Sequence, residues 1–235
     1  MAKQVVYREP TLAPDDNWLL LGEEGFVRFM APVTLKSLTI LSGQAVFCDE
    51  VNIERLTVID GRWVTNPSYN DHAVIFRGAT GYVGLLVTAE CGGHCIDIVA
   101  GTHDLTIDRW YGVQRPTDAG RRPAGWPTTQ NWPIHVDGIY ASDARRVTIN
   151  WAAYTNAYLG SGNAAIWLSG KCEDILVLGG RLRHPMHGMH MKGAARCGAR
   201  DTTFSAKYPW KEETGVLAPI QENVELIAQG GGGIQ

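Results

Sequence analysis

The sequence has no long hydrophobic run. Its most apolar stretch, residues 18–30, is interrupted by Gly22, Glu23, Glu24 and Arg28, whereas a membrane-spanning helix needs roughly 18 or more consecutive apolar residues. The N-terminal segment, MAKQVVYREP, also lacks the apolar stretch of a secretory signal. We therefore expect a protein that is made in the cytoplasm and has no membrane as a partner.

The sequence also lacks an excess of positive charge. Its 21 lysines and arginines are scattered and are outnumbered by 24 aspartates and glutamates, which gives a net charge of −3 at pH 7. Proteins that bind nucleic acid concentrate positive charge on one face. Nucleic acid is therefore not an expected partner.

Paired cysteine motifs are missing as well. The chain has five cysteines, an odd number, and without an export signal these are expected to be small buried hydrophobic side chains in a reducing compartment. Cys91, His94 and Cys95 form a single cluster that lacks the second half of a structural zinc site. We predict no metal and no other cofactor.

Helical periodicity is absent, and hairpin signals are nearly so. The only Asn-Gly or Asp-Gly dipeptides are Asp60-Gly61 and Asp137-Gly138. The apolar segments are instead strands of three to five residues, rich in Val, Ile, Leu and Thr, and separated by Gly, Asp or Asn. Such strands also suit an antiparallel sandwich or barrel, but that alternative calls for more hairpin signals than the sequence contains.

The sequence does contain a repeat. Residues 134–204 hold three copies of one pattern, in which an apolar strand, a small-residue corner and a polar pair precede a second strand. Ile139, Ile166 and Met189 occupy matching positions in the first strand, in steps of 27 and 23 residues. A strand repeat of this length is typical of a solenoid. We predict an all-β, single-domain, right-handed parallel β-helix, with the handedness taken from the family resemblance given below.

A second series marks the other strand of each copy. It contains Thr148, Leu176 and Thr203, and a longer ladder extends it in both directions. The members of this ladder are Thr57, Leu85, Thr106, Thr148, Leu176, Thr203 and Glu225. The interval of 42 residues between Thr106 and Thr148 amounts to about two turns of the solenoid.

The repeat divides the chain into parts. Residues 1–34 lack it and are predicted to form an irregular N-terminal arm or cap, residues 35–228 form the solenoid, and residues 229–235 form a Gly-rich tail. Within the solenoid, the Pro-rich and Gly-rich residues 111–133 predict a long lateral loop over one face. Residues 205–223 predict a second excursion from the stack.

Stacking brings residues that are one repeat apart to within about 4.8 Å. Histidines and aromatic residues of successive copies then form rows, as in a saccharide-binding groove, where aromatic faces stack on sugar rings and polar groups bind hydroxyls. The residues predicted to bind carbohydrate are Trp132, His135, Trp151, Tyr154, Tyr158, His184, His190 and Lys192. As the alternative, the histidines are structural and the aromatic residues cover hydrophobic surface.

The three copies resemble the pectin-lyase-like superfamily of right-handed parallel β-helices, and within it the family 28 glycoside hydrolases, the polygalacturonases. Residues 135–139, His-Val-Asp-Gly-Ile, are similar to the family's Asn-Thr-Asp-Gly-Ile, and Val-Thr-Ile follows at 147–149. Residues 186–188, Met-His-Gly, are similar to its Gly-His-Gly. The resemblance implies catalytic roles for Asp137 and His187, although Asp137 is equally well explained as a corner residue that caps a turn.

One departure from the family pattern concerns the chemistry directly. Where the family has two adjacent aspartates, this chain has Gly162 and Asn163. Inverting hydrolysis needs a carboxylic acid as well as a carboxylate that activates water. The family's downstream Arg-x-Lys has no clear counterpart either, and the aspartate cluster that binds calcium in pectate lyases is missing.

The sequence therefore favours a non-catalytic structural or adhesive protein. By analogy with phage β-helices, we expect a virion component that decorates a capsid or belongs to a tail. The predicted state is a homotrimer in contact with other virion proteins or with cell-surface polysaccharide. The alternative is an enzyme, a polysaccharide hydrolase or lyase that acts through Asp137 and the row of histidines.

Overall fold

The computed structural model describes residues 5–7, 17–59, 72–91, 93–114, 137–156 and 164–229. Every regular secondary-structure element in these residues is a β-strand. Within these ranges there is no helix of the length and apolarity needed to cross a membrane. The fold is therefore all-β, as predicted.

The strands are numbered in their order along the chain. They are β1 (Val5–Tyr7), β2 (Asn17–Phe29), β3 (Val33–Phe47), β4 (Glu50–Ile59), β5 (Val74–Arg77), β6 (Thr80–Ala89), β7 (Ile96–Val99), β8 (His103–Gln114), β9 (Ile139–Ser142), β10 (Arg145–Asn156), β11 (Ala164–Ser169), β12 (Glu173–Val177), β13 (Gly180–Arg183), β14 (His187–Met191), β15 (Gly198–Arg200), β16 (Thr202–Ala206), β17 (Tyr208–Glu212), β18 (Ile220–Glu222) and β19 (Glu225–Ala228).

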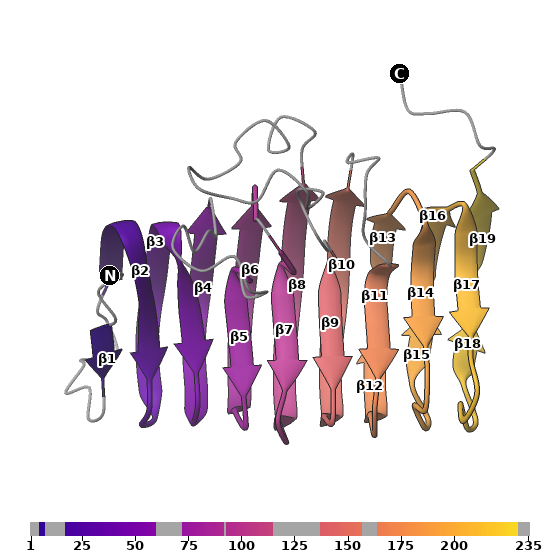
Figure 1. Ribbon diagram of the computed structural model, residues 1–235, viewed down its shortest axis with the longest axis horizontal. Coiled ribbons are helices and arrows are strands. Elements are labelled where there is room, and N and C mark those ends of the chain that lie inside the picture. Colours follow the sequence, from indigo (N-terminus) through magenta and orange to yellow (C-terminus); the bar gives the residue numbers. More distant parts are fainter. Residues whose placement is uncertain are drawn as a thin grey trace, which may run out of the picture.

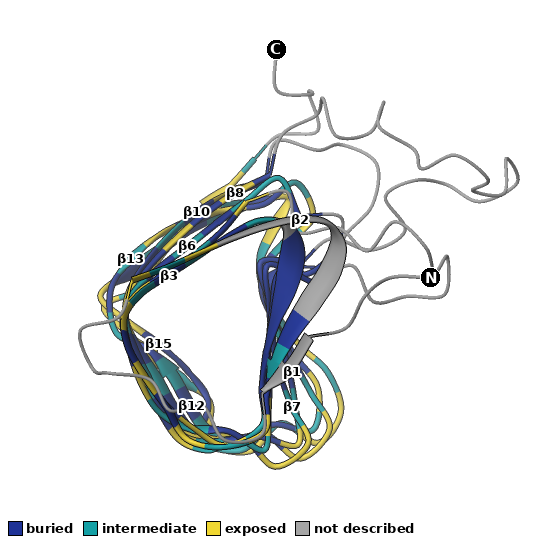
Figure 2. Ribbon diagram, turned by 90° about the vertical axis from the view of Figure 1, so that its left-hand side faces the viewer, coloured by how far each residue is buried: buried dark blue, intermediate teal, exposed yellow. Residues whose placement is uncertain are grey.

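The strands pair in parallel and form three faces, which enclose the core (Figures 1 and 2). Face A contains the end of β3 and then β5, β7, β9, β11, β14 and β17. Face B contains the first halves of β4, β6, β8 and β10, and then β12, β15 and β18. Face C contains the second halves of β4, β6, β8 and β10, and then β13, β16 and β19. This arrangement is consistent with a β-solenoid, in which one circuit of the chain is called a coil below.

The first repeat series is confirmed. Ile139 pairs with Ile166, and Ile166 pairs with Met189, on face A. All three side chains are buried. A strand sends alternate side chains to opposite sides, so register partners lie on the same side of the sheet. These positions point into the core in each coil.

The second series is confirmed only in part. Thr148 pairs with Leu176 on face B, but Leu176 then pairs with Gly198, and Thr203 lies on face C, where its partner is Arg181. The last step of the series is therefore wrong. The reason is that the chain has already turned from face B to face C before it reaches Thr203.

The interval of 42 residues is one coil rather than two. β8 pairs directly with β10, and Thr106 is the register partner of Thr148. The extra residues are therefore inserted into a single coil. They follow β8, which itself extends to Gln114, so residues 111–114 belong to a strand and not to the predicted loop.

The stack also reaches further at both ends than the sequence indicated. β2 pairs in parallel with β3, so residues 17–29 already belong to it. At the other end, β17 and β18 pair with β14 and β15, so residues 208–212 and 220–222 form most of a last coil. Its inward side chains, such as Trp210 and Val216, pack on the core, but the charged residues between them obscure the pattern.

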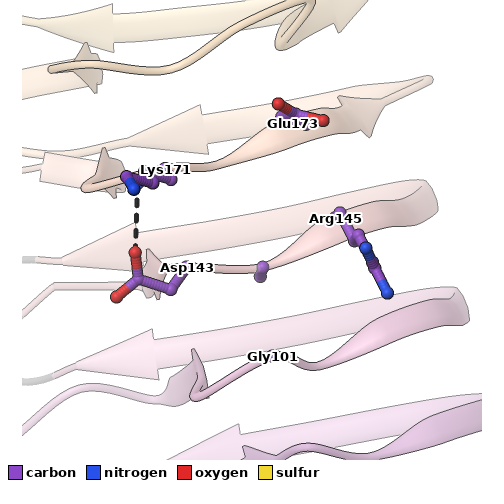
Figure 3. Close-up of a pocket in the computed structure, with 6 residues that line it drawn as sticks. Gly101, Asp143, Arg145, Lys171 and Glu173 are labelled. Atoms are coloured by element: carbon purple, nitrogen blue, oxygen red, sulfur yellow. Dashed lines mark hydrogen bonds between the residues drawn. The ribbon is translucent and has the colours of Figure 1, made fainter.

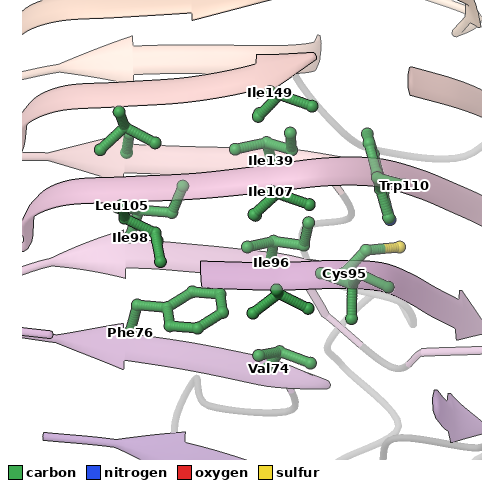
Figure 4. Packing of buried hydrophobic residues seen from close by; sticks show 14 of the residues in the cluster. Val74, Phe76, Cys95, Ile96, Ile98, Leu105, Ile107, Trp110, Ile139 and Ile149 are labelled. Carbon is green, nitrogen blue, oxygen red and sulfur yellow. The ribbon is translucent and has the colours of Figure 1, made fainter. Parts of the chain in front are cut away.

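Stacks of like side chains fill the interior. Phe29, Phe47 and Phe76 lie in successive coils, with ring centroids 5.2 and 5.5 Å apart. Figure 4 shows the aliphatic row beside them, which includes Ile96 and Ile139. Burial of each such side chain contributes roughly 1.5–3 kcal/mol to folding. All five cysteines are free thiols, and four of them are buried.

Aspartate and arginine alternate at the corner where face B begins. Asp104, Arg146, Asp174 and Arg196 have φ values of 51° to 55° and lie in successive coils. Arg146 donates two hydrogen bonds to Asp104, of 2.6 and 2.7 Å. Arg196 does the same to Asp174, at 2.7 and 2.9 Å. We call this row the charged ladder.

Candidate functional site

A ladder of hydrogen bonds runs along the corner between faces C and A. The ring Nδ1 of His72 accepts the backbone N–H of His94 at 3.1 Å, and Nδ1 of His94 accepts that of Asp137 at 3.3 Å. Oδ1 of Asp137 in turn accepts the N–H of Ala164 at 2.7 Å. Each corner side chain thus caps the next coil. In this arrangement both histidines carry their proton on Nε2.

Asp137 is a member of this corner ladder. Its side chain is fully buried, and one carboxylate oxygen is used by the Ala164 backbone. His94 Nδ1 lies 3.3 Å from the other oxygen. The geometry supports a capping role for Asp137, because a catalytic carboxylate has to reach the substrate.

Replacing Asp137 by alanine should lower the free energy of unfolding by about 1–3 kcal/mol, because the buried Ala164 N–H loses its acceptor. Asp137→Asn keeps an oxygen at this position and should cost less. Urea denaturation of the two variants measures the difference. Equal stability of Asp137→Ala and the wild type would contradict the capping role.

The row that contains Asp137 continues along the stack. Ala164 pairs with His187, and His187 pairs with Tyr208. Asp137 and His187 are therefore separated by two coils, about 10 Å along the stack, with Ala164 between them. Gly162 and Asn163 lie outside the described residues.

A continuous chain of aromatic rings follows face A. Its members, in order along the stack, are His72, His94, Tyr140, Trp167, His190, His187 and Tyr208. Neighbouring ring centroids are 4.5 to 5.7 Å apart, and the rings of Trp167 and His190 are parallel within 4°. We call the part from Tyr140 to Tyr208 the aromatic strip.

Charged side chains border the strip in the last coils. Glu213 accepts a hydrogen bond of 2.7 Å from Lys211 and lies 2.9 Å from Nε2 of His190. These two hydrogen bonds lower the pKa of Glu213 to about 2, so it is a carboxylate at neutral pH. Lys192 Nζ lies 3.8 Å away from it. Lys211, Lys192 and Glu213 thus form one cluster beside the strip, and Lys207 Nζ lies 5.1 Å from the centroid of the Tyr208 ring.

The two histidines of the strip contribute ring surface rather than free polar atoms. Burial, followed by the charges of His190 and Lys211, lowers the pKa of His187 to about 4, so this ring is neutral at neutral pH. Nδ1 of His187 and Nδ1 of His190 are buried and have no hydrogen-bond partner among the described residues. Nε2 of His190 lies against Glu213.

Asp97 lies on the same face, one coil before Tyr140. Burial raises its pKa to about 7, against the opposing effect of Arg77. Oδ2 lies 3.9 Å from Nε2 of His72, and Oδ1 has no hydrogen-bond partner within the described residues. The sequence analysis missed this residue, because an aspartate between the inward-facing Ile96 and Ile98 is expected on the outer side of the strand.

The structure separates the residues that were predicted to bind carbohydrate. His190 and Lys192 lie on β14 and just after it, together with His187, which was predicted to be catalytic. His184 is fully buried, and its Nδ1 accepts the N–H of Met186. Tyr154 is 2% exposed and stacks on Trp110 in the core. Neither of these two side chains is open to a ligand.

The remaining predicted residues lie elsewhere. Trp151 is exposed on face C, beside Tyr111, and so does not belong to the strip. Trp132, His135 and Tyr158 fall outside the described residues. Tyr140, Tyr208, Lys211 and Glu213 were not predicted.

A simple signal for the strip exists in the sequence. Tyr140, Trp167 and His190 each come directly after a member of the first repeat series, and they are register partners. Since the series points into the core, the next residue points outward.

A depression of about 420 Å³ lies at the corner between faces A and B. It is lined by Gly101, Asp143, Ala144, Arg145, Lys171 and Glu173 (Figure 3). Oδ1 of Asp143 accepts the backbone N–H of Lys171 at 3.2 Å, and φ of Asp143 is 54°. The depression is thus the surface of a capped turn whose aspartate already has a structural role.

The described carboxylates on face A do not form a hydrolytic pair. Asp97 and Glu213 lie four coils apart, about 19 Å along the stack, whereas glycosidase carboxyl groups lie roughly 5–9.5 Å apart. Within the described ranges, no group of three or more His, Cys, Asp or Glu side chains is placed to hold a metal.

No protein-family model, curated protein or solved structure matches the chain.

Proposed function

We propose that the protein is a non-catalytic adhesive β-solenoid that binds polysaccharide along the aromatic strip of face A. The observation that carries the proposal is the unbroken series of rings from Tyr140 to Tyr208. Sugar rings stack on aromatic faces, and the polar groups beside them bind hydroxyls. The rings themselves carry no charge, and Glu213 offsets one of the two positive charges of Lys211 and Lys192, so the ligand that we propose is a neutral polysaccharide.

The non-catalytic part of the proposal is supported by the roles of the candidate acids. Asp137 caps a backbone N–H at the corner, and Ala164 occupies the next position in its row. His187 is neutral at physiological pH. A single carboxylate beside neutral histidines lacks the acid that hydrolysis requires.

The proposal includes a finer description of the fold. We infer right-handed coils of the pectin-lyase-like kind, because connections between parallel strands of one sheet are right-handed in nearly all proteins. The trimeric state and the place on a virion remain predictions from the sequence and from fold-level analogy.

Tyr208→Ala is expected to weaken binding of a neutral polysaccharide about threefold to tenfold, which corresponds to one stacked ring. Tyr208 is 46% exposed, so its removal should leave the fold intact. The measurement is affinity gel electrophoresis in gels that contain dextran, β-glucan or galactan. The matched control is Tyr82→Ala, because Tyr82 is 42% exposed on face B.

Two results would contradict the proposal. One is that none of the three polysaccharides retards the wild type, and the other is that Tyr82→Ala weakens binding as much as Tyr208→Ala. The depolymerase alternative is tested on the same samples. Release of reducing or unsaturated ends by the wild type, but not by Asp137→Asn, would show that the protein is an enzyme.

A further inference from the structure

Two neighbouring arginines stand on the outer surface of face C. Arg181 and Arg183 belong to β13 and are both exposed. Within the described residues neither guanidinium makes an ion pair or a hydrogen bond. By contrast, Arg146, Arg196 and Arg200 are each bound to a carboxylate of an adjacent coil. Two positive charges on one face are thus left without a counter-ion.

The arginines line a depression of about 440 Å³. It exists because their register partners are small. Arg181 lies between Ala153 and Thr203 in the adjacent coils, and Thr155 and Ser205 flank Arg183 in the same way. Short side chains on both sides leave the two guanidinium groups room to hold a ligand between them.

The remaining groups in the depression indicate where an anion fits. Thr203 donates a hydrogen bond of 3.0 Å to Glu225, which places a carboxylate at the side of the last coil. The opposite side, towards Thr155, has a hydroxyl and no acid among the lining residues. An anion is therefore favoured between the arginines and β10.

An aromatic pair adjoins this side of the depression. Tyr111 and Trp151 are 42% and 37% exposed, and their ring centroids are 5.1 Å apart. Tyr111 and Ala153 are register partners, as are Ala153 and Arg181. The pair therefore lies one to two coils from the arginines, about 5–10 Å along the stack.

We propose that this surface of face C is a second binding site, which takes a saccharide that carries a sulfate or phosphate ester. The aromatic pair supports the sugar ring, and Arg181 and Arg183 bind the ester oxygens. Two arginines whose Cα atoms lie about 7 Å apart along one strand present two guanidinium forks, which suit a tetrahedral oxyanion with three free oxygens, whereas a single fork satisfies a carboxylate. The site is separate from the aromatic strip and does not depend on it.

Biolayer interferometry on immobilised dextran sulfate, with dextran as the uncharged reference, tests the site. The wild type should bind dextran sulfate, and the double variant Arg181→Gln/Arg183→Gln should raise its Kd at least about tenfold, because charge-assisted hydrogen bonds are lost. The matched control is Arg145→Gln/Arg200→Gln, which removes two exposed charges elsewhere. It should change the Kd less than about twofold.

Trp151→Ala should also weaken dextran sulfate binding, while Tyr208→Ala should leave it unchanged. The proposal is overturned if the wild type does not bind dextran sulfate, if the two double variants lose affinity equally, or if dextran sulfate binds as tightly to Arg181→Gln/Arg183→Gln as to the wild type. Loss in Tyr208→Ala alone would place the site on face A and reject the one on face C. A dextran phosphate arm distinguishes the two esters.

Discussion

Gly180→Ala is expected to lower the free energy of unfolding by about 3 kcal/mol or more. Gly180 is the first residue of β13 and has a φ of +120°, which L residues with a side chain rarely adopt. A Cβ atom at this position would overlap the carbonyl oxygen of Ala152 in the preceding coil. The backbone of two paired strands would have to move apart, and the measurement is urea denaturation followed by circular dichroism.

The neighbouring residue provides a matched control. A Cβ added to Gly179 would meet its nearest atoms, including the carbonyl oxygen of Asn150, at 3.4 Å, which is close to ordinary contact. Gly179→Ala should therefore cost much less than Gly180→Ala. Equal losses in the two variants would show that the register of β10 and β13 differs from the one described.

Asp97→Asn is expected to stabilise the protein at pH 8 by up to about 4 kcal/mol and to have little effect at pH 4. Burial raises the pKa of this carboxyl from 3.8 to about 7. The folded state therefore binds the proton more tightly than the unfolded state does. The contribution of the protonated Asp97 carboxyl to stability is complete below pH 4 and is lost as the pH rises through 7. A shift of about three pKa units, at 1.36 kcal/mol each, gives the maximum stabilisation of about 4 kcal/mol.

Denaturation with urea at pH 4, 6 and 8 measures this effect. The groups that face Asp97 are His72, with Nε2 3.9 Å away, and Arg77, which acts against the shift. Asp49→Asn removes one exposed charge and is the control, for which no comparable pH dependence is expected. If Asp97→Asn and the wild type keep a constant difference in stability across this range, Asp97 is not a buried acid.

The sequence predicted the fold well where the repeated positions point inward. Ile139, Ile166 and Met189 are apolar because they fill the same place in successive coils. The strands at 208–212 and 220–222 were not predicted. They belong to the last coil of the described residues, where Leu217 and Leu226 are exposed. With fewer neighbours to pack against, its inward positions follow the apolar pattern less strictly.

The candidate site was harder to predict, and β10 shows the reason. Val147 and Ile149 are buried in alternation, but the next buried residues are Ala152 and Tyr154. The chain bends between faces B and C at residues 150 and 151, where two consecutive side chains point outward. This bend shifts the alternation by one residue, so Tyr154 enters the core and Trp151 reaches the surface. Sequence spacing alone does not locate such a bend.

The charged ladder also disfavours one error in the stacking of the coils. Asp104, Arg146, Asp174 and Arg196 alternate in sign from one coil to the next. If the coil of β12 were to add directly to that of β8 during folding, Asp104 would lie beside Asp174. Stacking the coil of β15 on that of β10 would likewise bring Arg146 beside Arg196. Backbone pairing alone does not distinguish these coils, because parallel strands of similar length can pair in either order. Like-charge repulsion therefore disfavours a stack that omits one coil. The alternating charges on the surface of the solenoid thus favour the native order of the coils.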